Sequence, residues 1–227
     1  MSETATEDLA AALRPTAVID SDSPAVAALV ARVAPDPDED RLERILRLYY
    51  AVRDEIRYDP YGIMLDREAF RASHCLAAGT GYCITKAAVL AAAARAIGVP
   101  ARLGFADVRN HLATPRLLSL MDTDIFAWHG FTVLYLDGRW VKATPAFDLA
   151  LCERFGVVPL EFDGRTDSVF HPFDSQGRKH MEYVRDRGAW DDLPYEAITA
   201  DFRRLYSRLI GRRGGDFHAE AGPGAVS

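Results

Sequence analysis

The 227-residue sequence lacks several features that would assign it to a class at once. It has three cysteines, Cys75, Cys83 and Cys152, an odd number at no spacing typical of a disulfide framework. It has no apolar run of about 18 residues, so we expect no membrane-spanning helix. Residues 1–16 carry acidic residues and no basic segment ahead of an apolar run, so no signal or transit peptide is expected. These absences predict a protein of the reducing cytoplasm.

The sequence also lacks a surplus of basic charge. Its formal net charge is -6, from 27 lysines and arginines against 33 acidic residues, and both signs are interspersed along the chain. The arginine pairs 203–204 and 212–213 are typical of a solvated helix face and its C-terminal end. We therefore expect neither a nucleic-acid partner nor a membrane partner.

Sequence patterns for a metal or an organic cofactor are lacking as well. His74, Cys75 and Cys83 come nearest to a zinc site, but without the paired C-x-x-C or H-x-x-x-H spacing. There is no obvious acidic loop for calcium and no glycine-rich segment for phosphate groups. We expect a protein that needs no cofactor.

What is present is the composition of an ordinary globular protein, with 49% apolar and 26% charged residues and no internal repeat. At this length we expect one domain over residues 21–212, with a sizeable core. Residues 1–20 are predicted to be a flexible lead-in, and the Gly- and Ala-rich residues 213–227 a disordered tail.

The elements are expected in the order helices, then strands, then a closing helix. Asp137-Gly138 is a strong two-residue hairpin signal. This order predicts an α+β domain with a mainly antiparallel sheet packed against a buried helix. The expected helices cover 24–33, 37–56 with a cap at Asp36, 66–72, 83–97, 149–155 and 195–209. The expected strands cover 101–108, 125–136, 139–144, 157–162 and 180–185.

Cys83 lies where a glycine turn, Gly79-Thr80-Gly81, passes into a long Ala-rich helix. The first turn of a helix has unpaired backbone N–H groups and partial positive charge, which stabilise a thiolate and lower its pKa. The position therefore indicates a nucleophile. The alternative is a small buried residue, because free cysteine is among the most buried residue types.

His129 lies near the start of the best hairpin in the chain. Nucleophilic cysteine chemistry needs a base within hydrogen-bond reach, and a histidine on a central strand is held rigidly enough to act as one. The alternative is a histidine that only fills a strand position with its hydrogen bonds satisfied.

Taken in order, these motifs resemble the transglutaminase-like cysteine superfamily in its bacterial form. The resemblance covers residues 46–147: the G-x-C before an apolar helix, the exit Gly98-Val99-Pro100-Ala101-Arg102, and a histidine opening a strand–Asp-Gly–strand hairpin with Trp140. It implies an α+β core like that of papain-type peptidases, with a Cys-His-Asp triad. Cys83 matches the family's nucleophile and His129 its base.

The third member of the triad is where the sequence departs from the family. The family usually has an aspartate four residues past the tryptophan of the second hairpin strand, and Thr144 stands there. A threonine hydroxyl can accept a hydrogen bond from an imidazole N–H but brings no negative charge. We predict that Asp148 orients His129, with Thr144 or a dyad lacking a third member as alternatives. Asp107 and Asp163 also stay open.

Further residues are candidates for a substrate cleft. Tyr82 and Trp128, next to the candidate nucleophile and base, are expected to line it. Asn110 and His111 either line the cleft or belong to a surface loop. The irregular stretch 162–174 is either a lid over the site or a plain surface connection.

The leading hypothesis is a cysteine enzyme that acts on a peptide, protein or small amide substrate through an acyl-enzyme. Water as acceptor would make it a peptidase or amidase, and an amine would make it a transglutaminase. The backbone N–H of Cys83 is one expected oxyanion donor, and the glutamine that papain-type enzymes place before the nucleophile has no counterpart in residues 73–82. The alternatives are a non-catalytic binding or scaffold domain with a degraded triad and, ranked last, acyl transfer from a thioester.

Overall fold

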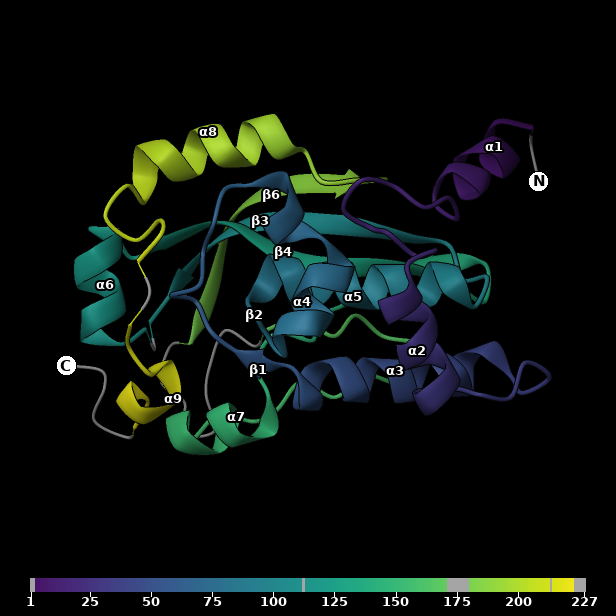
Figure 1. Cartoon of the computed structure of the whole chain (residues 1–227), viewed down its shortest axis with the longest axis horizontal. Helices are drawn as coiled ribbons and strands as arrows, with labels where there is room; N and C mark the ends of the chain where they lie inside the picture. Colours follow the sequence, from purple (N-terminus) through teal and green to yellow (C-terminus); the bar gives the residue numbers. More distant parts are fainter. Residues whose placement is uncertain (1–2, 112, 171–179, 213, 223–227) are drawn as a thin grey trace.

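The core of the fold is an antiparallel sheet packed on one buried helix (Figure 1). The computed structural model describes residues 3–111, 113–170, 180–212 and 214–222. The sheet has the order β5-β4-β3-β6, and all three strand pairs are antiparallel. The expected α+β class is confirmed. The strands are β3 (Ala101–Asn110), β4 (Ile125–Leu136), β5 (Arg139–Ala143) and β6 (Met181–Trp190).

Helix α5 (Cys83–Ala96) runs through the middle of the molecule, with β3 and β4 against one side and other helices against the opposite side. Its alanines at 87, 88 and 91–94 are fully buried, because a small apolar side chain lets neighbours approach from every direction. The covering helices are α2 (Pro24–Val33), α3 (Arg41–Glu55) and α4 (Ala72–Ala78).

The β4–β5 hairpin forms as the sequence predicts. Asp137 and Gly138 have positive φ values of 49° and 82°, as a two-residue turn between right-twisted strands requires. Behind the turn, Thr132 of β4 pairs with Ala143 of β5. The hairpin therefore fixes the register between the strand that carries His129 and the chain that continues to Thr144.

The other elements connect and cover this core. A short parallel pair, β1 (Arg57–Tyr58) with β2 (Thr80–Gly81), leads the chain to Cys83. Figure 1 shows α8 on the side of the sheet away from α3, and α7 beside α9 near the C-terminus. The remaining elements are α1 (Glu3–Ala11), η1 (Arg67–Phe70), α6 (Pro115–Met121), α7 (Leu149–Phe155), α8 (Tyr195–Leu205) and α9 (Phe217–Glu220).

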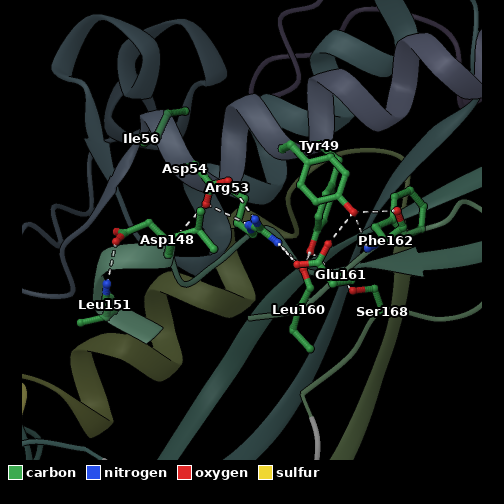
Figure 2. Close-up of polar contacts among 12 residues, drawn as sticks. Tyr49, Arg53, Asp54, Ile56, Asp148, Leu151, Leu160, Glu161, Phe162 and Ser168 are labelled. Atoms are coloured by element: carbon green, nitrogen blue, oxygen red, sulfur yellow. Dashed lines mark hydrogen bonds and ion pairs between the residues drawn. The ribbon is translucent and has the colours of Figure 1, made fainter. Parts of the chain in front are cut away.

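Several local predictions were wrong. The helix expected over 66–72 is a 3-10 helix over Arg67–Phe70, and the closing helix ends at Leu205 instead of residue 209. Helix α3 begins four residues later than expected, because the Asp36 side chain accepts a hydrogen bond from Asp38 N–H in a turn and Asp40 caps the helix. Residues 157–162 form no strand. Their carbonyls bind side chains of α3 instead, since the Tyr49 hydroxyl and the Arg53 guanidinium both donate to the Leu160 carbonyl, at 2.8 Å each (Figure 2).

The ends of the chain are more structured than predicted. In the segment expected to be a flexible lead-in, Ala12, Val18 and Ile19 are fully buried, and Ala101 N–H donates to the Ala12 carbonyl. In the segment expected to be a disordered tail, Phe217 of α9 is only 2% exposed. Both segments bury apolar side chains. The composition of the surrounding residues, rich in small and polar residues, gave no indication that these side chains would be buried. Residues 171–174 of the suggested lid lie outside the described part.

Candidate active site

Cys83 is the first residue of α5, and the turn before it is built by local hydrogen bonds. Gly79 ends α4 with a positive φ of 65°, a conformation that glycine adopts without strain. The Thr85 hydroxyl then accepts from Tyr82 N–H at 3.0 Å and donates to the Tyr82 carbonyl at 3.2 Å. These bonds make Tyr82 the N-cap and leave Cys83 at the helix N-terminus, as predicted.

Strand β4 passes very close to this helix N-terminus. A Cβ on Gly130 would lie 2.8 Å from the Ile84 Cα and 3.1 Å from the Ile84 nitrogen, so the approach requires glycine. The backbone N–H groups of Gly130, Ile84 and Cys83 act together to stabilise the thiolate form of Cys83. The backbone N–H of Gly130, the residue after His129, is thereby directed at the Cys83 thiol.

Burial nevertheless outweighs these donors. It raises the pKa of the Cys83 thiol to about 11, with the three backbone N–H groups opposing the shift. The prediction of a lowered pKa from the helix N-terminus is therefore wrong for this conformation. The N–H groups are present as expected, but the mostly apolar surroundings of the partly exposed thiol solvate a thiolate poorly.

His129 lies on β4 and is 4% exposed. Burial lowers its pKa to about 4, and the neighbouring His180 adds to the shift. The His129 ring packs against Phe170, with 5.3 Å between ring centroids, and its Nε2 has no hydrogen-bond partner among the described residues. The imidazole is neutral at pH 7 and able to accept a proton.

Cys83 and His129 line the same cavity, which is almost entirely apolar. Its volume is about 40 Å³. That is room for a few water molecules and not for an acyl substrate. The structure therefore describes a narrow cavity, at which Cys83 is partly exposed. Its other lining residues are Tyr58, Pro60, Ile63, Tyr82, Leu117, Met121, Phe126, Ala127, Trp128, Phe202, Tyr206 and Leu209.

Tyr82 and Trp128 thus line the cavity of Cys83 and His129, as the sequence suggested for a cleft, and Asn110 and His111 are not among its lining residues. Asn110 ends β3, is buried, and lines a smaller void that His129 also lines. His111 follows the strand, and its Nε2 is 3.5 Å from a carboxylate oxygen of Glu182.

The carboxylate of Asp148 is used elsewhere. It caps α7 by accepting from Leu151 N–H at 2.9 Å, as Figure 2 shows, and from Tyr58 N–H at 3.0 Å. The Nε2 of His218 on α9 lies 3.2 Å from the same carboxylate. None of the contacts described for Asp148 reaches His129, so the predicted orienting role is not what this conformation shows. Helix capping and the C-terminal segment take up its oxygens instead.

The other candidates for a third member are also occupied or unpaired. Thr144 is fully buried, and its hydroxyl has no hydrogen-bond partner in the described part of the chain. Asp107 accepts from Trp128 N–H and Arg187, and Asp163 forms an exposed turn with Arg165. Within the described residues, His129 and Cys83 line one cavity, and no side chain is hydrogen-bonded to His129 Nε2.

The sequence is similar to one known protein family. The sequence profile of the transglutaminase-like superfamily matches residues 27–145, more than half of the chain. The chain belongs to this superfamily. The match contains Cys83, His129 and Thr144 and stops before Asp148.

The fold is also similar to that of a solved structure over most of the chain. A solved structure of a proposed cysteine protease from Cytophaga hutchinsonii is similar, with 16% sequence identity and a TM-score of 0.47. The similarity covers 78% of this chain and 63% of that chain, and it carries no argument about the site. No curated protein sequence matches.

One buried charged residue close to Cys83 was not predicted from the sequence. Lys86, one turn after Cys83, is completely buried, and its Nζ donates to the carbonyls of Arg53 at 2.8 Å and Ile56 at 2.6 Å. Burial lowers its pKa to about 8. Lys86 of α5 thereby provides hydrogen-bond donors to the backbone carbonyls at the C-terminal end of α3. The available signal was a single lysine in an otherwise apolar stretch of helix.

Over the described residues, no group of three or more His, Cys, Asp and Glu could hold a metal ion. His74 and Cys75 line a separate cavity of about 350 Å³, and Tyr82 forms part of its wall as well. In the same described ranges, no helix is long and apolar enough to cross a membrane.

Proposed function

We propose that this transglutaminase-like protein is a cysteine-dependent enzyme that hydrolyses or transfers an acyl group, with Cys83 as nucleophile and His129 as general base. The observation that carries the proposal is the shared cavity: Cys83 at a helix N-terminus and a neutral His129 line it together. Peptide, protein and small amide substrates suit this chemistry.

The reaction starts from a neutral pair, because the pKa of Cys83 lies near 11 and that of His129 near 4. Cys83 Sγ attacks the substrate carbonyl carbon while His129 accepts the thiol proton. The new S–C bond forms, the C–N bond of the amide breaks, and His129 returns the proton to the leaving amine. Water or an amine then attacks the thioester, and the thiol is restored.

Backbone N–H groups are available for the oxyanion. Those of Cys83 and Ile84 are among the first N–H groups of α5, which have no partner within the helix. Together with Gly130 N–H they surround the sulfur and stabilise negative charge there. A carbonyl oxygen bound beside the sulfur would develop its charge within reach of the same donors.

A direct test uses p-nitrophenyl acetate, a small activated acyl donor. We expect a burst of p-nitrophenol and an acetyl group on Cys83, identified by peptide mass spectrometry. Cys83→Ala abolishes both, and His129→Ala slows acetylation by about 10²-fold, the usual contribution of a general base. Cys152→Ala is the matched control, because this buried cysteine lies on α7 away from the cavity. Equal acetylation of Cys83 with and without His129 would contradict the proposal.

A non-catalytic binding domain is the second candidate function. It is favoured by the absence of an orienting side chain on His129 among the described residues and by the occupied carboxylate of Asp148. This candidate predicts that Cys83 is not acetylated faster than the buried Cys75. The same experiment therefore separates the two functions.

A further inference from the structure

Immediately before His129, strand β4 contains a residue in an unusual backbone conformation. Trp128 has a positive φ of 60°, which costs a residue with a bulky side chain about 1–2 kcal/mol. Trp128 is buried at 4% exposure. Such a conformation persists only where the surroundings enforce it.

The sheet register shows what this conformation does. Val108 of β3 pairs with Phe126 and Ala106 pairs with His129, so that Asp107 alone stands opposite both Ala127 and Trp128. This is a β-bulge with its extra residue on β4. Without the extra residue the pairing would move by one, and every side chain from His129 onward would change faces of the sheet. The bulge therefore decides that His129 faces the cavity.

Three side chains from different elements hold Trp128 in place. The Asp107 carboxylate accepts from Trp128 N–H at 3.0 Å. Asp201 of α8 accepts from the indole N–H at 2.9 Å. Arg187 of β6 donates to Asp107 at 2.8 Å and to Asp201 at 3.1 Å, and its guanidinium lies 4.4 Å from the centre of an indole ring. Arg187 thus links the carboxylates of Asp107 and Asp201, and all three side chains contact Trp128.

A fourth side chain satisfies the rest of the bulge. The Tyr206 hydroxyl accepts from Ala127 N–H at 2.6 Å and donates to the Ile125 carbonyl at 2.8 Å. Backbone groups that lose their strand partners at the bulge thus find partners from the segment that follows α8. The N–H groups of both bulge residues, Ala127 and Trp128, are thus hydrogen-bonded to side chains.

From this geometry we infer that Asp107, Arg187 and Asp201 are positioning residues for His129, acting through the bulge at Trp128. None of the contacts described for these residues is with Cys83 or His129: their charged groups bind one another, Trp128 and, in the case of Asp201, Arg204 as well. The inference rests on the proposed function in so far as it concerns catalysis, since it supplies the fixed geometry that a base without an orienting carboxylate needs. It also explains why the site can lack the family's aspartate.

The test compares Asp107→Ala and Arg187→Met with the milder Asp107→Asn and Arg187→Lys. Asn keeps an oxygen for Trp128 N–H but loses the charge that Arg187 binds. We expect acetylation of Cys83 by p-nitrophenyl acetate to fall at least tenfold in Asp107→Ala and Arg187→Met. A smaller loss is expected in the two milder variants.

A second readout does not depend on activity. The imidazole signals of His129, assigned by their loss in His129→Gln, are followed by NMR from pH 3 to 8. In Asp107→Ala and Arg187→Met the His129 midpoint should rise by at least one pH unit, because the ring leaves its apolar cavity. Where these variants do not fold, the same measurements on Asp107→Asn and Arg187→Lys decide.

Asp191→Asn is the matched control. It removes a carboxylate that binds Arg102 of β3 at 2.7 Å. The substitution therefore removes an ion pair of β3 and leaves the contacts of the bulge intact. It should leave the His129 midpoint and the acetylation rate unchanged.

Folded Asp107 and Arg187 variants with a wild-type His129 midpoint would overturn the inference. If the wild-type protein itself is not acetylated at Cys83, the proposed function fails, while the NMR midpoint still decides the positioning role.

Discussion

The buried neutral imidazole of His129 makes the fold sensitive to acid. Its pKa is about 4 in the folded protein, against 6.5 for an unperturbed histidine. A proton therefore binds the unfolded chain more tightly than the folded one. The stability linked to His129 is complete above pH 6.5, where both states are neutral, and is lost as the pH falls toward 4.

The size of the effect follows from the shift. A difference of about 2.5 between the two pKa values corresponds to between about 3 and 4 kcal/mol at the acid limit. About 2 kcal/mol of this is lost at pH 5 and about 3 kcal/mol at pH 4. The cause is burial first and the neighbouring His180 second, so the value belongs to the buried position of the ring.

The assay is urea unfolding of wild type and His129→Gln from pH 7.5 to 4. Carboxylates titrate in both proteins, so the informative quantity is the difference between their free energies of unfolding. We expect the advantage of wild type over the variant to decrease by about 3 kcal/mol across this range. His74→Gln, at an exposed histidine of α4, should keep the wild-type dependence. A constant difference between wild type and His129→Gln would refute the reasoning.

Two further predictions concern the same site. Phe217 of α9 packs on Tyr58, with 5.8 Å between ring centroids, and lines the void beside His129, so Phe217→Ala should hydrate the site. We expect the Cys83 pKa to fall in this variant, and a fall of one unit would raise the alkylation of Cys83 by iodoacetamide at pH 7 about tenfold, as measured by peptide mass spectrometry. Val158→Ala, at an exposed position, is the control. Unchanged labelling of Cys83 in Phe217→Ala would contradict the prediction. Thr144→Asp restores a carboxylate at the family's position and should raise the His129 pKa by about one unit or more in an NMR titration. Thr144→Asn lacks the charge, and identical midpoints in these two variants would show that position 144 does not reach His129.

Much of the fold near the site could be predicted because it is encoded locally. The apolar helix over α5, the glycine turn before Cys83 and the Asp137-Gly138 hairpin each depend on neighbours in sequence. The strand expected over 157–162 failed for the opposite reason. Its backbone is bound by Tyr49 and Arg53, more than a hundred residues earlier, and no local pattern signals that competition.

The packing of the C-terminal segment could not be predicted from local sequence patterns either. Phe217 and His218 stand in a Gly- and Ala-rich segment that looks like a disordered tail, yet they contact Tyr58 and Asp148. The sequence offers the aromatic and the histidine but not their partners. The role expected of Asp148 changed for this reason.

The sequence by itself determined that Cys83 stands at a helix N-terminus and that His129 opens the central hairpin, because helix caps and two-residue turns are properties of short segments. Only the tertiary structure decided the charge states of this pair, since the pKa values depend on how much water the surrounding chain excludes. It also decided the face on which His129 lies. That depends on a bulge held by Asp107, Arg187 and Asp201, which come from two strands and a helix far apart in the sequence.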